Sequence, residues 1–172
     1  MDEATFETLY NETARPLWSY LYRASGDRTL ADDILQETYY RFLRAPRANM
    51  DKAQTKSYLY RIAGNLLRDH WRGKKRERQF TVSETDAIDS AESVAGEALD
   101  SLDLERRFQQ LKPQERALLW LAYVEGNEHK EIARVLGLRD KSIRVLLFRA
   151  RQRLIGLLQP KDRDEEERNA KR

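Results

Sequence analysis

The chain has 172 residues, of which 40% are hydrophobic and 35% are charged, and its formal net charge at pH 7 is +3. The absence of cysteine excludes disulfides, thiolate metal sites and cysteine nucleophiles, and it fits the reducing cytoplasm. No apolar run approaches about 18 residues, and the acidic N-terminus does not resemble a signal peptide, so we expect a cytoplasmic protein without membrane insertion.

Glycine and proline are few, and alternating β-branched residues are scarce, so we predict an all-α fold. The small net charge hides a strong segregation. Residues 61–78 carry seven Lys or Arg against two acids, residues 79–104 carry seven acids and no Lys or Arg, and residues 139–153 carry six Lys or Arg against one acid. Two basic blocks separated by an acidic one suggest two contact surfaces for a polyanion, joined by a tether.

We therefore predict two small helical domains, over residues 1–78 and 100–158, with a flexible acidic linker at 79–99 and a charged C-terminal tail at 159–172. The first domain is expected to hold three helices, over about residues 3–24, 30–43 and 56–76. Thr29 and Asp32 suggest an approximate capping box at the start of the second helix. The outer face of that helix mixes acid, amide and aromatic side chains, which is typical of a protein-docking surface. Its residues are Asp32, Gln36, Tyr39, Tyr40 and Leu43.

The third helix carries a polar stripe opposite its apolar side, formed by Arg61, Asn65, Arg68 and Arg72. Three guanidinium groups in a row repel one another, and a phosphate backbone would relieve this repulsion. The Asn65 amide can bond a base edge, and Trp71 offers a plane for stacking. The alternatives are a solvated arginine face and a Trp71 that closes the bottom of the core. This stretch alone does not separate the two interpretations.

The second domain is expected to begin with helices over residues 102–111 and 113–126, with Pro113 at the first turn and Gly126 as the stop signal. A helix-turn-helix pattern follows over residues 128–155, in which Gly137 makes the turn. The second helix of this pair presents polar side chains at its N-terminal end, where helix-turn-helix proteins enter the major groove. These are Arg139, Lys141, Ser142 and Arg144, and Arg149, Arg151 and Arg153 further along suit phosphates. The alternative is a helical hairpin with a solvated basic face.

The sequence offers little for catalysis. His70 and His129 are isolated, and we find no Gly-rich phosphate loop and no nucleophile motif. Asp32 and Asp33 point about 100° apart on a helix and do not converge on one site. We expect neither an enzyme nor a site for a cofactor or a metal.

Three segments carry a resemblance to a known family. They are "LADDILQETYYRFLR", "SYLYRIAGNLLRDHWRGKKR" and "LDLERRFQQLKPQERALLWLAYVEGNEHKEIARVLGLRDKSIRVLLFRARQRL". In this order, and with an acidic linker between the last two, they resemble the bacterial RNA polymerase sigma factors of the extracytoplasmic-function (ECF) group, over about residues 5–158. A stand-alone helix-turn-helix regulator is the alternative, but it would need neither the outer face of the second helix nor the stretch at 61–76.

The resemblance implies a role for each segment. The protein would bind core RNA polymerase, with the second helix on the β′ clamp helices and the second domain on the β flap. It would recognise the −10 and −35 promoter elements, help to open the DNA and be held inactive by an anti-sigma factor. The residues implied for the clamp helices are Asp32, Asp33, Gln36, Glu37 and Tyr40. Those implied for the −10 element are Tyr60, Arg61, Asn65, Arg68, Arg72, Lys74 and Lys75, beside a base pocket at about 48–56. Those implied for the −35 element are Arg139, Lys141, Ser142, Arg144 and Arg149.

Three departures from the family pattern stand out. Tyr58 stands where the family often has Trp. Gly64 lies in the basic helix where a larger residue is more usual, and we expect it to loosen that helix. The run from Val145 to Phe148 is apolar where the family commonly carries another polar residue. The sequence leaves open whether Leu146 and Phe148 are exposed or covered by the preceding helix.

Overall fold

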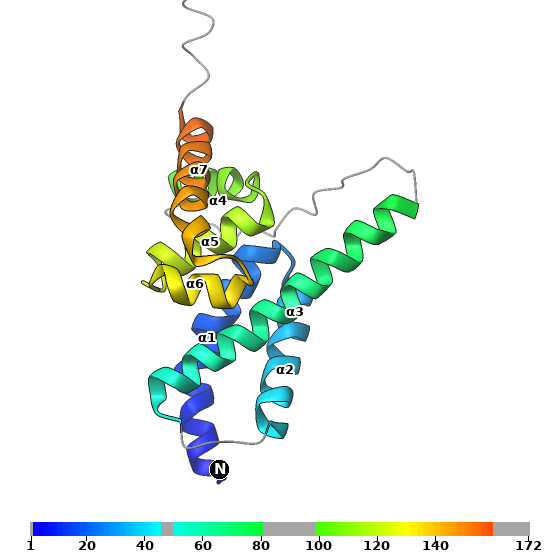
Figure 1. Ribbon diagram of the computed structural model, residues 1–172, viewed down its shortest axis with the longest axis vertical. Helices are drawn as coiled ribbons and strands as arrows, with labels where there is room; N and C mark the ends of the chain where they lie inside the picture. Colours follow the sequence, from blue (N-terminus) through cyan, green and yellow to red (C-terminus); the bar gives the residue numbers. More distant parts are fainter. Residues whose placement is uncertain (1, 46–49, 81–98, 160–172) are drawn as a thin grey trace, which may run out of the picture.

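The computed structural model describes residues 2–45, 50–80 and 99–159, and over these residues the chain is all-helical, as predicted. The helices are α1 (Glu3–Ser25), α2 (Arg28–Arg44), α3 (Lys52–Phe80), α4 (Leu99–Gln109), α5 (Pro113–Tyr123), α6 (His129–Leu136) and α7 (Asp140–Leu158). Figure 1 shows α1, α2 and α3 in one group and α4 to α7 in another. Most of the predicted linker and tail lies outside the described residues.

The first group forms around apolar side chains at helical spacing on α1, α2 and α3. Leu17, Leu21, Leu59 and Leu67 are fully buried. The helix starts differ from those expected. Asp27, not Thr29, caps α2, because its carboxylate accepts the backbone N–H of Leu30 at 3.0 Å. α3 starts earlier and ends later than predicted, and Asp51 accepts the N–H of Gln54 at 2.8 Å before its first turn.

Tyr39 was predicted on the outer face of α2, and that placement is wrong. The residue is 5% exposed and lies in the seam between α1 and α2. Its hydroxyl and that of Thr13 share a hydrogen bond of 2.7 Å, and its ring lies 4.9 Å from that of Tyr10. Burial of the ring is stabilising here because the hydroxyl of Tyr39 keeps a hydrogen-bond partner in Thr13. A seam of apolar side chains alone would leave that hydroxyl without a partner.

The second group contains the predicted helix-turn-helix. Gly137 ends α6 with φ of 60°, a left-handed conformation that side chains disfavour. Ile143 and Leu147 are buried and fix α7 against α6, as the periodicity predicted. α5 begins at Pro113, as expected, but ends at Tyr123, before Gly126.

The two groups are in contact with each other. α5 packs against α1 and α6 packs against α3, so the buried side chains of both form one continuous core. In Figure 1, α3 runs diagonally beneath α6, and its C-terminal half projects beyond the rest of the molecule. The candidate binding residues are therefore divided between surfaces of one compact body and a projecting helix.

Candidate nucleic-acid and protein interfaces

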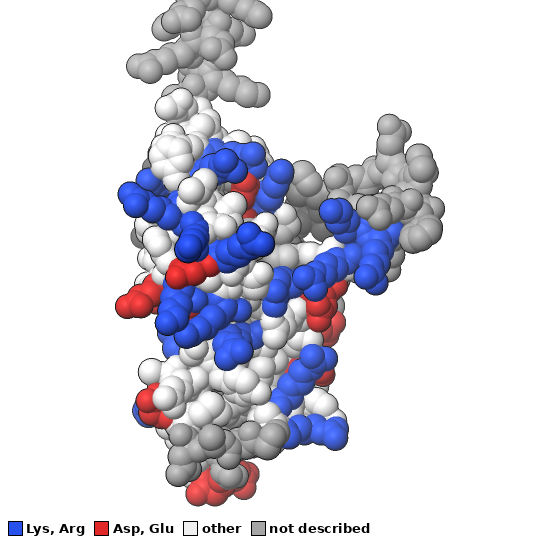
Figure 2. All heavy atoms as spheres, viewed as in Figure 1, with Lys and Arg blue, Asp and Glu red and all other residues white. Residues whose placement is uncertain are grey.

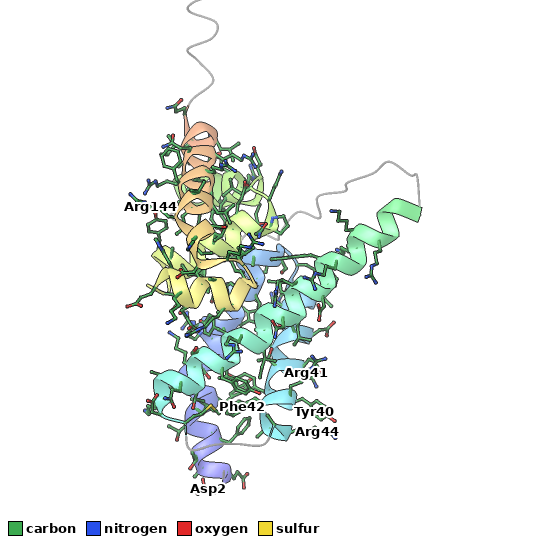
Figure 3. The ribbon with its side chains drawn as sticks, viewed as in Figure 1. Asp2, Tyr40, Arg41, Phe42, Arg44 and Arg144 are labelled. Atoms are coloured by element: carbon green, nitrogen blue, oxygen red, sulfur yellow. The ribbon has the colours of Figure 1, made fainter. Side chains whose placement is uncertain are left out.

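The outer side of α2 has a small hollow lined by Asp33, Gln36, Glu37 and Tyr40, which we call the docking face. Tyr40 is 51% exposed, and Arg44 contacts its hydroxyl. Figure 3 shows Tyr40, Arg41 and Arg44 together along this side of α2. An acidic hollow with an exposed aromatic ring can receive a basic, partly apolar surface of another protein.

Asp32 is separated from the other predicted docking residues. Its carboxylate accepts the indole N–H of Trp18 at 2.6 Å and so faces α1. Trp18 in turn stacks on Tyr22, with ring centroids 5.2 Å apart. The structure thus brings four of the five predicted docking residues to one hollow, while the fifth binds a side chain of its own domain.

The polar stripe of α3 is present but not uniform. Arg61, Asn65 and Arg72 are exposed, whereas Arg68 is half-buried and donates to the side-chain oxygen of Asn65. Trp71 is partly buried and packs against the core, which favours the structural interpretation over a stacking platform.

Lys74 and Lys75 are exposed on the projecting half of α3. In Figure 2, Lys and Arg side chains gather along this half and over α6 and α7. A run of exposed cations of this kind attracts a polyanion.

Tyr60 does not reach the surface. It is 3% exposed, its ring lies 5.5 Å from that of Tyr20, and Glu125 of the second group lies beside it. Burial, and then the neighbouring Glu125 carboxylate, raise the pKa of Tyr60 far above the ordinary value, so the phenol is neutral at physiological pH. In this arrangement Tyr60 cannot touch a nucleic acid.

The N-terminal end of α7 is open to solvent. Arg139, Lys141 and Arg144 are exposed and Ser142 is half-buried; we call these four residues the recognition end. In Figure 3, Arg144 projects from α7 on the side away from α3. Arg149 is also exposed and lies more than one helical turn further along α7, toward its C-terminal end.

The apolar run on α7 is divided between surface and core. Phe148 is 52% exposed and Val145 is 49% exposed, whereas Leu146 is half-buried and packs against the core. The guanidinium of Arg151 lies 5.9 Å from the centre of the Phe148 ring.

Sequence reasoning missed Arg116. Its guanidinium is almost fully buried, with the residue 6% exposed, and it donates to carbonyl oxygens of both groups. Within the second group the acceptors are Gln109 at 2.8 Å and Leu111 at 3.0 Å; in the first group they are Ala24 at 2.9 Å and Ser25 at 3.3 Å. The only available signal was a cation inside the apolar stretch "ERALLWLAY", which does not reveal its acceptors.

Comparison with known proteins decides the family. The family model described as Sigma-70 region 2 matches residues 9–77, and the one described as Sigma-70, region 4 matches residues 101–154. The chain is 30% identical over 156 residues to the ECF RNA polymerase sigma factor SigL of Mycobacterium tuberculosis, covering 87% of this chain and 86% of SigL. The chain belongs to the ECF RNA polymerase sigma factors.

Other members agree with this assignment. SigM of Bacillus subtilis is 29% identical over 160 residues, covering 89% of this chain and 94% of SigM. The fold is shared with the sigma factor RpoE of Bartonella quintana, solved in complex with the anti-sigma factor NepR, at a TM-score of 0.67 and 22% identity, covering 91% of this chain and 98% of RpoE.

In this ECF sigma factor the region 2 match falls on α1 to α3 and the region 4 match on α4 to α7, and we call these two groups of helices region 2 and region 4. The protein is a promoter-recognising sigma factor, and the presence of both regions disfavours the stand-alone regulator. In the part of the chain that the structure describes, no helix is long and apolar enough to cross a membrane.

Proposed function

We propose that the sigma factor binds core RNA polymerase through the docking face and promoter DNA through α3 and α7. What supports this division is the separation of an acidic, aromatic hollow on α2 from arginine-rich faces on α3 and α7. Asp33, Gln36, Glu37 and Tyr40 meet the β′ clamp helices, with Asp32 at the edge of that contact. Region 4 meets the β flap.

For the −10 element we propose the α3 stripe. Arg61, Arg68 and Arg72 contact the phosphates of the melted strand, and Lys74 and Lys75 continue this path along the projecting half of α3. The exposed amide of Asn65 reads a base edge. Tyr60 joins this surface only when region 4 moves away from it. Part of the base pocket implied at about 48–56 lies outside the described residues.

For the −35 element we propose the recognition end of α7. Arg139, Lys141, Ser142 and Arg144 are placed to enter the major groove, because they lie at the N-terminal end of the second helix of the pair. Arg149 contacts a phosphate further along. Ile143 and Leu147 hold this helix rigidly on α6, which is the support that base reading requires.

We further propose that the protein works in the cytoplasm and has no catalytic activity of its own, since the reaction belongs to the polymerase. RpoE of B. quintana was solved with an anti-sigma factor. An anti-sigma factor that covers a polymerase-binding face is the partner we expect for this chain.

The test is transcription by purified core polymerase on a genomic promoter library, combined with a core-binding assay. Asp33→Arg reverses the charge in the docking face and should weaken core binding strongly, because like charges at a contact are repulsive. Glu7→Arg, an exposed position on α1, makes the same change in charge away from that face and should bind like the wild type. No initiation from any promoter, together with unchanged core binding by Asp33→Arg, would refute the proposed docking.

A further inference from the structure

The middle of α3 packs against α6 of region 4, and the backbones of the two helices come close together at Gly64. Gly64 is buried, and a Cβ atom there would collide with the carbonyl oxygen of Val135 and lie 2.9 Å from its Cγ1 atom. A buried backbone group cannot yield as a flexible side chain can. The absence of a side chain at residue 64 is therefore what lets the two helices meet.

The turn of the helix-turn-helix lies on Arg68, a member of the α3 stripe. A side chain at Gly137 would collide with the Arg68 guanidinium. That guanidinium also donates to the carbonyl oxygen of Gly64 at 3.4 Å and to the side-chain oxygen of Asn65. In this arrangement the polar groups of Arg68 and Asn65 are partly used within the protein rather than presented to DNA.

Acidic side chains of region 4 reach the N-terminal half of α3. Glu125, whose side chain is 7% exposed, pairs with Lys56 at 3.1 Å, and Glu131 accepts a hydrogen bond from the hydroxyl of Ser57. The Lys56 ammonium lies 5.6 Å from the centre of the buried Tyr60 ring. Two carboxylates of region 4 thus face an ammonium and a hydroxyl group of α3, which makes the contact complementary in charge as well as in shape.

A second contact fixes region 4 on α1. Arg116 donates to the carbonyl oxygens of Ala24 and Ser25 at the C-terminal end of α1, where the helix dipole favours a cation. Burial lowers the pKa of Arg116, yet the guanidinium remains charged and satisfied by carbonyl acceptors. Next to it, Arg23 pairs with Glu105 and lies 5.8 Å from the centre of the Trp120 ring.

Region 4 buries part of α3 but leaves the other candidate surfaces exposed. The docking face on α2 and the recognition end of α7 stay exposed, whereas Tyr60, Gly64 and Arg68 on α3 are buried or half-buried against region 4. Figure 1 shows α6 beside α3, above it in this view, with α2 on the opposite side of α3.

We propose that the free sigma factor is closed, with region 4 acting as an intramolecular cover over the centre of the −10 surface on α3. Single-stranded promoter DNA binds there only after α6 leaves Gly64. This inference rests on the proposed use of α3 for the −10 element. A closed chain lowers the apparent affinity for DNA by the fraction of molecules that are open.

The test compares two glycines of the same helix in the full chain. Gly64→Ala adds a methyl group that collides with Val135, whereas Gly73→Ala adds one with no atom within 4 Å. Both changes raise helix propensity by a similar amount, so Gly73→Ala controls for that effect. We expect Gly64→Ala to increase the radius of gyration measured by small-angle X-ray scattering, and Gly73→Ala to leave it unchanged. Equal scattering from both variants would overturn the proposal.

DNA binding is measured with a fluorescent single-stranded oligonucleotide pool of random sequence. If about one molecule in ten or fewer is open, a fully open Gly64→Ala chain should bind at least about tenfold more tightly than Gly73→Ala. Adding Arg68→Ala to Gly64→Ala should remove most of this gain, which assigns it to α3 rather than α7. An open Gly64→Ala chain that gains no affinity would refute the use of α3 for DNA, and with it the role of the cover. Whether the free chain is closed is tested separately, by the scattering comparison of Gly64→Ala with Gly73→Ala.

A crosslink gives a second measurement that does not depend on how Gly64→Ala folds. The chain has no cysteine, so Ser57→Cys with Glu131→Cys places the only two thiols at contacting positions. A short bismaleimide across them should hold the chain closed and weaken binding of the oligonucleotide pool by more than about tenfold relative to the same variant with each thiol blocked, because the crosslinked chain has no open fraction. Unchanged binding after crosslinking would contradict the proposal.

Discussion

At the scale of single residues, buried phenols show how the core of region 2 depends on pH. Tyr20 is fully buried, and its hydroxyl has no hydrogen-bond partner among the described residues. Burial raises the pKa of Tyr20 far above its ordinary value, while the charge of Arg68 opposes that shift in part. The neutral phenol is therefore the form that the core accepts.

Tyr20→Phe should leave the free energy of unfolding at pH 7 unchanged or slightly higher, because it removes a buried hydroxyl without a partner. In the unfolded chain the phenol ionises near pH 10. The pKa of Tyr20 is higher in the folded state than in the unfolded state. Folding with Tyr20 therefore keeps its full stability below about pH 10, and stability is lost as the pH rises above that value because only the unfolded chain ionises. Urea unfolding between pH 8 and 11 should show a smaller alkaline loss for Tyr20→Phe than for the wild type; an equal loss would contradict the assignment.

Arg68 is the residue of the α3 stripe for which we expect the clearest effect on DNA. Arg68→Ala should weaken open-complex formation and lower the slope of log affinity against log salt by about 0.7, the value for one phosphate contact on a single strand. Arg15→Ala, an exposed position on α1, is the matched control and should leave the slope unchanged. An unaltered slope for Arg68→Ala would contradict the assignment of the α3 stripe to DNA binding.

At the scale of helices, periodicity predicted the number and order of the main elements, but it located their ends less well. Apolar spacing was sufficient for the cores of α1 to α3 and for the α6–α7 pair, because burial dominates there. The cap of α2 was misplaced because Asp27 and Thr29 are both good capping residues, and only the backbone geometry selects between them. Tyr39 was misplaced because its partner, Thr13, lies on another helix, which the pattern of one helix cannot reveal.

This correction at α2 can be tested by a pair of substitutions. Asp27→Ala removes the acceptor for the N–H of Leu30 and should lower the free energy of unfolding by about 1 kcal/mol. Thr29→Ala changes an exposed side chain within the helix and should have an effect of less than about 0.5 kcal/mol. Thermal unfolding followed by circular dichroism measures both. A larger loss for Thr29→Ala would restore the capping box expected from the sequence.

At the scale of the whole molecule, most of the candidate binding residues lie at the surface, as predicted, but Tyr60 is buried and the arrangement of the two regions was not predictable. The docking face and the recognition end lie on helix surfaces, as spacing and charge predicted. The contact between regions 2 and 4 depends on Gly64, Gly137 and Arg116, whose partners in the other region lie more than 65 residues away along the chain. In the sequence alone, a glycine within a helix and a cation within an apolar stretch both appear to be destabilising. Their role becomes visible only when the helix that packs against them is known.

The shared core also predicts how the molecule unfolds. Because α5 packs on α1 and α6 on α3, the two regions stabilise each other, and the wild type should unfold in one cooperative transition by calorimetry. Gly64→Ala separates α6 from α3 and should split this transition into two, since each region then keeps only its own core. Gly73→Ala should keep the single transition, because its methyl group meets no atom within 4 Å. Two transitions in the wild type would mean that the contact between the regions is too weak to couple them, and the cover over α3 would then be open much of the time.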